Sequence, residues 1–241
     1  MLLIDGKLYE SQELPVICFG ESRPLSYILN PKAACTLALH FVFFVNHNYR
    51  YFDLAYLHVS RLAMLRLHGS ELDPVALRTF LRLSPETFSI VRDPLRRFVS
   101  AFFQKVFTDG DPVYVPFRDM LTSLHGIDLS PEANPAQSCL SFAKWVASHE
   151  NQKSFDAHFR PQHLNIAVGG RFKVGSILRL EDRDDLFAFF SKWIGAEKAK
   201  WFLSIPFNTQ KYAIDEFVTD ELKEVVRAIY AEDYKLFYAD C

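Results

Sequence analysis

A lysine and a hydroxyl residue lie at the junction between an apolar segment and a helix-like segment, in the run Asn30-Pro31-Lys32-Ala33-Ala34-Cys35-Thr36. Backbone N–H groups at the start of a helix attract anions, and the Lys32 ammonium and the Thr36 hydroxyl can reach the same group. The junction therefore indicates a phosphate cradle, although it lacks the Gly-x-x-x-x-Gly-Lys-Ser/Thr spacing of the common nucleotide loop. An ordinary turn with a solvated lysine explains this segment alone about as well.

A second candidate anion site begins with an arginine at the end of another apolar segment. Arg92 directly follows Phe88–Val91, so a planar guanidinium lies where a strand is predicted to end. Asp93 and Pro94 are typical of a helix N-terminus, and Ser100 lies about two helical turns beyond Arg92. A capped amphipathic helix explains Asp93 and Pro94, but it does not explain an arginine at the end of an apolar strand.

Together the two segments resemble the two signatures of sulfotransferases that use 3′-phosphoadenosine 5′-phosphosulfate (PAPS). The first is similar to the 5′-phosphosulfate loop of that family, although Ala34 stands where the loop often has glycine. An alanine there costs stability if the position needs a positive φ. The second resembles the 3′-phosphate element, which implies that Arg92 and Ser100 hold the 3′-phosphate. The residues implied to hold the 5′-phosphosulfate are Lys32, Ala33, Ala34, Cys35 and Thr36.

Three later segments are similar to the carbohydrate-type members of this family. Asp156–Gln162 resembles their His-Trp-Arg-Pro-Gln stretch, residues 172–181 resemble their Val-Gly…Glu strand, and residues 230–237 resemble their C-terminal helix. The resemblance implies transfer of a sulfuryl group to a hydroxyl of a carbohydrate, as a glycan or glycolipid. Arg160 and Gln162 either contact this acceptor or fix their own loop, and an anionic sugar suits the guanidinium.

Sulfuryl transfer needs a positive group near the leaving oxygen and a base for the acceptor hydroxyl. The resemblance assigns the first role to Lys32, which stabilises the leaving phosphate oxygen. His158 is the first candidate for the base, because it lies in the segment shared with the carbohydrate-type enzymes. His68, between the two phosphate elements, is the second candidate, and Glu181 is the third.

The composition excludes several other classes of function. The formal net charge of −2 over 241 residues does not fit a basic nucleic-acid-binding domain. The four cysteines form no CxxC pair, so neither a zinc site nor a disulfide scaffold is indicated, and no metal is expected. The chain lacks a signal-peptide pattern and an apolar run of about 18 residues, and we expect a cytoplasmic protein with no transmembrane segment.

Strands and helices must alternate to place these residues. Apolar segments over residues 25–29, 88–91 and 172–180 predict three strands, each followed by a helix-like pattern. This alternation predicts one α/β domain over residues 1–241 with a central parallel sheet flanked by helices. The resemblance implies that the domain is a P-loop-like three-layer sandwich.

Three further segments have distinct patterns. The apolar spacing of Arg50–Leu67 predicts a helix, and Thr219–Lys235 predicts a strong helix with Thr219 as its N-cap. Residues 108–137 are polar and rich in proline, which predicts an irregular loop or lid near the acceptor site.

Two alternatives compete with the sulfotransferase hypothesis. A P-loop-like nucleotide kinase or phosphotransferase needs a Gly-Lys-Ser/Thr loop and a magnesium-binding aspartate after a strand, and the sequence shows neither. A non-catalytic nucleotide-binding protein needs only the two phosphate elements. Transfer of sulfate from PAPS distinguishes an enzyme from such a binding protein.

Overall fold

The computed structural model describes most of the chain as ten stretches: residues 3–4, 7–8, 17–19, 25–48, 65–67, 86–108, 112–149, 155–166, 174–206 and 214–239. The candidate base His68 lies outside the described residues. The chain divides into two compact units, each assembled from separate stretches. The sheet unit comprises residues 12–92 and 164–209, and the helical unit comprises residues 1–11, 93–163 and 210–241. A single domain over residues 1–241 stays a prediction.

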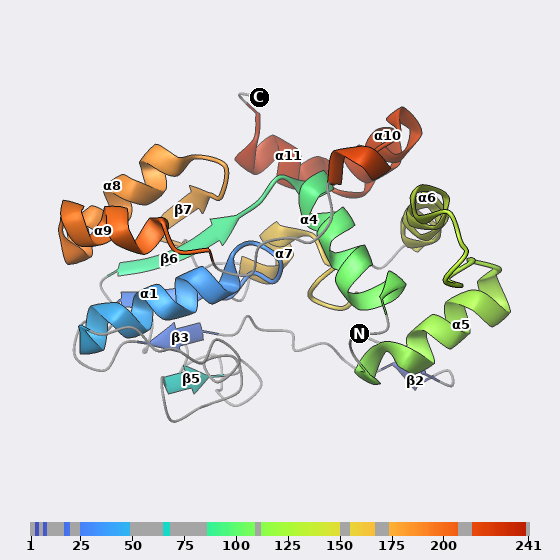
Figure 1. The fold of residues 1–241 in the computed structure, drawn as a ribbon, viewed down its shortest axis with the longest axis horizontal. Coiled ribbons are helices and arrows are strands. Elements are labelled where there is room, and N and C mark those ends of the chain that lie inside the picture. Colours follow the sequence, from blue (N-terminus) through green and yellow to red (C-terminus); the bar gives the residue numbers. More distant parts are fainter. Residues whose placement is uncertain are drawn as a thin grey trace. The chain divides into compact units, whose positions relative to one another are not determined.

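The sheet unit contains a five-stranded sheet with the order β5-β3-β4-β6-β7 (Figure 1). Its parallel part consists of β4 (Leu25–Ile28), β6 (Glu86–Val91) and β7 (Ser176–Arg179), which confirms the three predicted strands. At the other edge, β3 (Ile17–Phe19) pairs antiparallel with both β4 and β5 (Leu65–Leu67). The sheet is therefore mixed, with a parallel core.

The helix predicted over Arg50–Leu67 is wrong at its C-terminal end. Residues 65–67 form β5, because Leu-Arg-Leu alternates with the period of a strand and pairs with β3. Residues 50–64 of that predicted helix lie outside the described residues.

An aromatic cluster joins three helices to one face of the parallel strands. These helices are α1 (Cys35–His47), α8 (Arg183–Ile194) and α9 (Ala196–Leu203). Phe41 of α1 stacks on Phe190 of α8 with the ring centroids 3.7 Å apart, and its edge meets Phe88 of β6. Because Phe88 is fully buried, α1 is fixed against the strand whose end carries Arg92.

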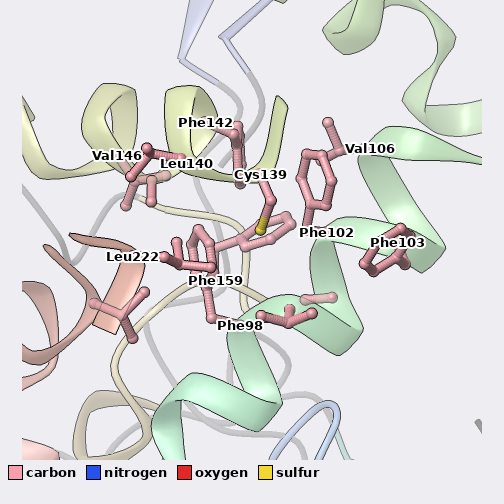
Figure 2. Close-up of a cluster of buried hydrophobic side chains, with 14 of the residues drawn as sticks. Phe98, Phe102, Phe103, Val106, Cys139, Leu140, Phe142, Val146, Phe159 and Leu222 are labelled. Carbon is pink, nitrogen blue, oxygen red and sulfur yellow. The ribbon is translucent and has the colours of Figure 1, made fainter. Parts of the chain in front are cut away.

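The helical unit is built around a second apolar cluster. Its main helices are α4 (Pro94–Ala101), α6 (Pro135–Ala147), α10 (Asp220–Ile229) and α11 (Ala231–Phe237), and α4 continues into the π-helical segment η2 (Phe102–Phe107). Figure 2 shows Cys139 of α6 among Phe98, Phe102 and Phe159. Burial raises the pKa of the Cys139 thiol far above its ordinary value, which makes this cysteine a core residue rather than a nucleophile.

The remaining elements are short. They are β1 (Leu3–Ile4) and β2 (Lys7–Leu8), which pair antiparallel, the 3-10 turns η3 (Pro112–Tyr114) and η5 (Ile214–Phe217), and the helices α5 (Val115–His125) and α7 (Gln162–Ile166). None of the helices in the described ranges combines the length and the hydrophobicity that crossing a membrane requires.

The segment over residues 108–137 contains more regular structure than predicted. Three of its four prolines lie at helix starts: Pro112 begins η3, Pro116 lies in the first turn of α5, and Pro135 begins α6. Proline suits these positions because the first helical N–H groups have no partner within the helix. A role for this segment as a lid stays a prediction.

The C-terminal helix is divided in two. Thr219 caps α10 as predicted, since its side chain accepts a hydrogen bond from the Leu222 N–H at 3.1 Å. The single helix predicted over Thr219–Lys235 is nevertheless wrong, because Tyr230 leaves the helical conformation and α11 starts after it. The Tyr230 hydroxyl is buried and donates to the carbonyl oxygen of Phe159 at 2.6 Å, which fixes this break against the core.

Candidate functional site

The loop between β4 and α1 has an unusual backbone conformation. Lys32 has a φ of 66° and Ala34 a φ of 58°, while Ala33 between them does not have a positive φ. Alternating conformations of this kind point successive N–H groups to one side and form concave anion-binding nests. Ala34 is also the N-cap of α1, where it makes no side-chain cap, and the first turn contains no acidic residue. The loop and the helix dipole together favour an anion here.

Asn30 holds this loop in place. Its carbonyl oxygen accepts the Ala33 N–H at 3.3 Å and the Cys35 thiol at 2.9 Å. Its side-chain amide donates to the carbonyl oxygen of Ile90 at 3.0 Å and accepts from the Asn165 amide at 3.3 Å. Asn30 is fully buried, so it ties the loop between β4 and α1 to the neighbouring strand β6. This role was not predicted from the sequence, although the Asn30-Pro31 turn marked the position.

Arg92 follows β6 directly, as predicted. Since β4 and β6 are parallel neighbours, their C-terminal ends lie at the same edge of the sheet, where open α/β sheets bind ligands. The guanidinium Nη1 of Arg92 donates to the carbonyl oxygen of Lys32 at 3.4 Å. The fold therefore brings these two predicted residues together. Thr36, four residues after Lys32, is buried in the first turn of α1.

The helix that follows Arg92 begins as predicted. The Asp93 carboxylate accepts the Arg96 N–H at 2.8 Å, and Pro94 is the first residue of α4. Ser100 lies near the C-terminal end of α4, in the helical unit, with 7% of its surface exposed. Its predicted partner Arg92 belongs to the sheet unit, so the shared 3′-phosphate site stays a prediction.

His158 makes a short contact with an acidic side chain two residues earlier. Its Nδ1 lies 2.6 Å from Oδ1 of Asp156, and about a quarter of each side chain is exposed. The hydroxyl of the buried Tyr114 donates to Oδ2 of Asp156 at 3.1 Å and lies 3.2 Å from the same His158 Nδ1. Burial alone raises the pKa of Asp156, but the hydrogen bonds and charge of His158 outweigh it and hold the pKa well below its ordinary value.

Arg97 fixes the backbone on both sides of His158. This arginine of α4 is almost completely buried, and it donates from Nη1 to the Arg160 carbonyl at 2.9 Å and from Nη2 to the Ala157 carbonyl at 2.7 Å. This role of Arg97 was not predicted from the sequence. The available signal was the second arginine of the run Arg-Asp-Pro-x-x-Arg-x-x-Ser, which extends from Arg92 to Ser100.

Arg160 and Gln162 are both buried in the same loop. Arg160 donates from Nε and Nη2 to the carbonyl oxygen of Phe155, at 3.2 and 3.1 Å. The backbone N–H of Gln162 donates to Oδ2 of Asp233 at 2.7 Å. These contacts are of the kind that fixes a loop, and contact with an acceptor stays a prediction for both residues.

A second histidine–aspartate pair follows directly. His163 Nδ1 lies 2.6 Å from Oδ1 of Asp233, which is fully buried in α11 and also accepts the His163 backbone N–H at 2.9 Å. Asp233 thereby caps the start of α7, and nothing in the sequence pattern indicated this pairing. Glu181, the third candidate base, follows β7 and is exposed. No cluster of three or more potential metal ligands occurs among the residues that the structure describes.

Comparison with known proteins supports the resemblance seen in the motifs. A sequence model of the sulfotransferase family matches residues 18–239, which include both phosphate elements and the His158 loop. No curated protein and no solved structure shows a significant match to the chain. Enzymes of this family transfer a sulfuryl group to an acceptor and generally use PAPS as the donor. Since the match covers nearly the whole sequence, the chain belongs to the sulfotransferase family.

Proposed function

We propose that this chain transfers the sulfuryl group of PAPS to a hydroxyl of a carbohydrate acceptor, on a P-loop-like three-layer α/β fold. One observation carries the proposal. The loop in which Lys32 and Ala34 have a left-handed backbone leads into α1, and Arg92 at the end of the adjacent strand donates to the Lys32 carbonyl at 3.4 Å. Two groups that favour anions thus meet at one edge of the sheet, which suits a nucleotide with phosphates at two positions.

The chemistry of these residues fits the donor. The loop offers backbone N–H groups and the Lys32 ammonium, Thr36 offers a hydroxyl, and no carboxylate stands in the first turn of α1. In this proposal the residues Lys32 to Thr36 hold the 5′-phosphosulfate, and Arg92 and Ser100 hold the 3′-phosphate. When bound, PAPS supplies the sulfuryl group: the acceptor oxygen bonds to sulfur, the bond from sulfur to the phosphate oxygen breaks, and 3′-phosphoadenosine 5′-phosphate is left.

Two side chains carry the chemical roles. Lys32 places a positive charge near the leaving phosphate oxygen, where negative charge develops. His158 accepts the proton of the acceptor hydroxyl, and its contact with Asp156 suits a histidine that acts as a base. Arg160 and Gln162 contribute to acceptor binding through the shape of their loop. His68 remains the second candidate base, and loss of the His158 imidazole without loss of turnover would favour it.

The carbohydrate acceptor rests on the resemblance of three segments to carbohydrate-type enzymes, of which Asp156–Gln162 is the most specific. A glycan or a glycolipid both present the required hydroxyl. An acceptor screen with sulfate-labelled PAPS and panels of neutral and acidic sugars tests this part. Transfer to a phenol or a simple alcohol in preference to every sugar would contradict it.

Nucleotide binding tests the donor. We expect 3′-phosphoadenosine 5′-phosphate to raise the melting temperature much more than ATP with magnesium does, because only the former carries a 3′-phosphate. Lys32→Ala and Arg92→Ala remove this shift, whereas Lys200→Ala, an exposed lysine of α9, keeps it. Equal stabilisation by ATP with magnesium would favour the kinase alternative. Binding without any sulfate transfer would favour a non-catalytic nucleotide-binding protein.

A further inference from the structure

Three polar side chains meet beside the loop over residues 155–160. Tyr114 comes from the turn η3, while Asp156 and His158 come from the loop itself. Asp156 uses both carboxylate oxygens: Oδ1 lies 2.6 Å from the His158 Nδ1, and Oδ2 accepts the Tyr114 hydroxyl at 3.1 Å. Asp156 thus contacts the His158 Nδ1 with one oxygen, while Tyr114 binds the other oxygen of the same carboxylate.

The short distance to Asp156 decides which nitrogen of His158 carries the proton. A carboxylate only accepts hydrogen bonds, so the nitrogen beside it must be the one that bears hydrogen. In the neutral imidazole the other nitrogen, Nε2, then has a free lone pair. This tautomer is the one in which His158 can take a proton through Nε2 while it remains bonded to Asp156.

Tyr114 restrains the carboxylate rather than the imidazole. Its hydroxyl lies 3.2 Å from the His158 Nδ1, but that nitrogen already donates to Asp156, so the phenol proton is directed to Oδ2. Tyr114 is almost fully buried, and Lys105 of η2 lies over its ring with Nζ 4.9 Å from the centroid. A buried phenol held in this way gives the carboxylate one fixed orientation.

The other charged groups at this loop act on its backbone or on the same carboxylate. Arg97 donates to the carbonyl groups of Ala157 and Arg160, on either side of His158. The Arg160 guanidinium interacts electrostatically with Asp156 and bonds to the Phe155 carbonyl. Arg160 therefore favours the ionised carboxylate, and Arg97 fixes the backbone of the loop.

We infer that Asp156 and Tyr114 are positioning residues that hold the His158 imidazole with its proton on Nδ1, so that Nε2 accepts the proton of the acceptor hydroxyl. This inference rests on the proposed function and adds to it the two residues through which the base is oriented. The hydroxyl proton moves to Nε2 as the hydroxyl oxygen bonds to sulfur and the bond from sulfur to the phosphate oxygen breaks.

Steady-state kinetics test the inference in the full chain. Asp156→Asn should lower kcat by about 100- to 10,000-fold, the range of a misoriented or wrongly protonated base, with little change in the KM for PAPS. Tyr114→Phe should lower kcat by roughly 3- to 30-fold, since it removes one hydrogen bond from a hydroxyl to the carboxylate. Asp184→Asn, an exposed carboxylate of α8, should leave kcat unchanged. Unaltered kcat in Asp156→Asn would overturn the inference.

Two further kinetic readouts separate positioning from general damage to the fold. Asp156→Asn should cause no further loss of kcat when His158 is already replaced by alanine, because it acts through the imidazole. Tyr114→Phe should have no effect when His158 is already replaced by alanine, because it acts through the imidazole. An equal loss from either change in that background would contradict the assigned role.

A spectroscopic test does not depend on activity. In protein labelled with ¹⁵N-histidine, the His158 nitrogens, identified by their loss in His158→Ala, should show the tautomer with hydrogen on Nδ1. Asp156→Asn should change this pattern. A wild-type tautomer with hydrogen on Nε2 would refute the inference even if sulfate transfer occurs. The expected tautomer in a protein that transfers no sulfate and does not bind 3′-phosphoadenosine 5′-phosphate would instead refute the proposed function.

Discussion

The Arg92 guanidinium donates a hydrogen bond from Nη1 to the carbonyl oxygen of Lys32, 3.4 Å away, although 60 positions separate the two residues. They meet because β4 and β6 are parallel neighbours, with Tyr27 opposite Phe88 in the register. Arg92 therefore has two roles that a substitution can remove. It offers positive charge to an anion, and it restrains the loop that carries Lys32.

Substitution of Arg92 should separate charge from geometry. Arg92→Lys keeps the charge but loses the planar fork, and we expect about a 10-fold weaker affinity for 3′-phosphoadenosine 5′-phosphate, or about 1.4 kcal/mol. Arg92→Ala loses both, and we expect a loss of at least about 100-fold. Isothermal titration calorimetry measures both values, with Arg183→Ala on α8 as the control. Equal affinity in Arg92→Lys and the wild type would show that the fork makes no contact.

Glycine at position 34 should stabilise the protein. Ala34 has a φ of 58°, a conformation that costs a non-glycine residue about 1–2 kcal/mol, while the extra freedom of glycine in the unfolded chain costs about 0.4–1 kcal/mol. We therefore expect Ala34→Gly to raise the free energy of unfolding by roughly 0.5–1 kcal/mol, measured by urea titration. The neighbouring Ala33→Gly is the matched control and should lower it, because Ala33 does not have a positive φ. Destabilisation by both changes would mean that the loop is not left-handed at Ala34 in solution.

The sequence was sufficient to predict the two strand ends next to Lys32 and Arg92, because the signals there are local. An apolar run, a change of pattern and a charged residue at the boundary predicted β4 with Lys32 and β6 with Arg92. The alanine at position 34 also indicated a conformational cost, and the structure has a positive φ there. Signals of this kind need only a few consecutive residues, since strand ends and helix starts are set by neighbouring side chains.

The supports of the site could not be predicted because they join distant parts of the chain. Tyr114 reaches Asp156 across 42 positions, and Asp233 reaches the backbone of Gln162 across 71. Neither pairing leaves a periodic pattern, and prolines near Tyr114 instead suggested an irregular loop. Proline marks the first turn of a helix as often as a break, so residue type alone did not distinguish them.

Alanine at position 175 should disturb the junction between β6 and β7. Gly175 precedes β7, and a Cβ added there would lie 2.9 Å from the Thr87 carbonyl oxygen, which is backbone and cannot move aside alone. We expect Gly175→Ala to destabilise the protein by about 1–3 kcal/mol, as overpacking does in a packed interior. Thr87→Ser should be close to neutral, because it keeps the hydroxyl that accepts the Gly175 N–H at 2.9 Å. A melting temperature unchanged by Gly175→Ala would contradict the close approach.

Replacement of Arg97 should be far more harmful than replacement of its neighbour. Arg97→Met leaves the carbonyl groups of Ala157 and Arg160 without these buried donors, and we expect a loss of roughly 2–4 kcal/mol in unfolding free energy. Arg96→Met, on the same helix, removes only an exposed contact with Asp215 and should stay within about 0.5 kcal/mol of the wild type. Chemical denaturation of both variants measures the difference. Similar losses in the two would show that Arg97 does not hold the loop.

The acid stability of the protein should depend on Asp156. Its pKa is lower in the folded chain than its ordinary value near 4, because the hydrogen bonds and charge of His158 outweigh the effect of burial. A lowered folded-state pKa contributes stability that is present above the unfolded value and is lost as the pH falls through the folded value. The gap in unfolding free energy between the wild type and Asp156→Asn should therefore be largest above about pH 4 and should shrink as the pH falls further. Urea titrations from pH 2 to pH 6 measure it, with the exposed Asp119→Asn expected to parallel the wild type. A gap that stays constant down to pH 2 would mean that the Asp156 carboxylate is not bound to His158, and the proposed orientation of the imidazole would need another source.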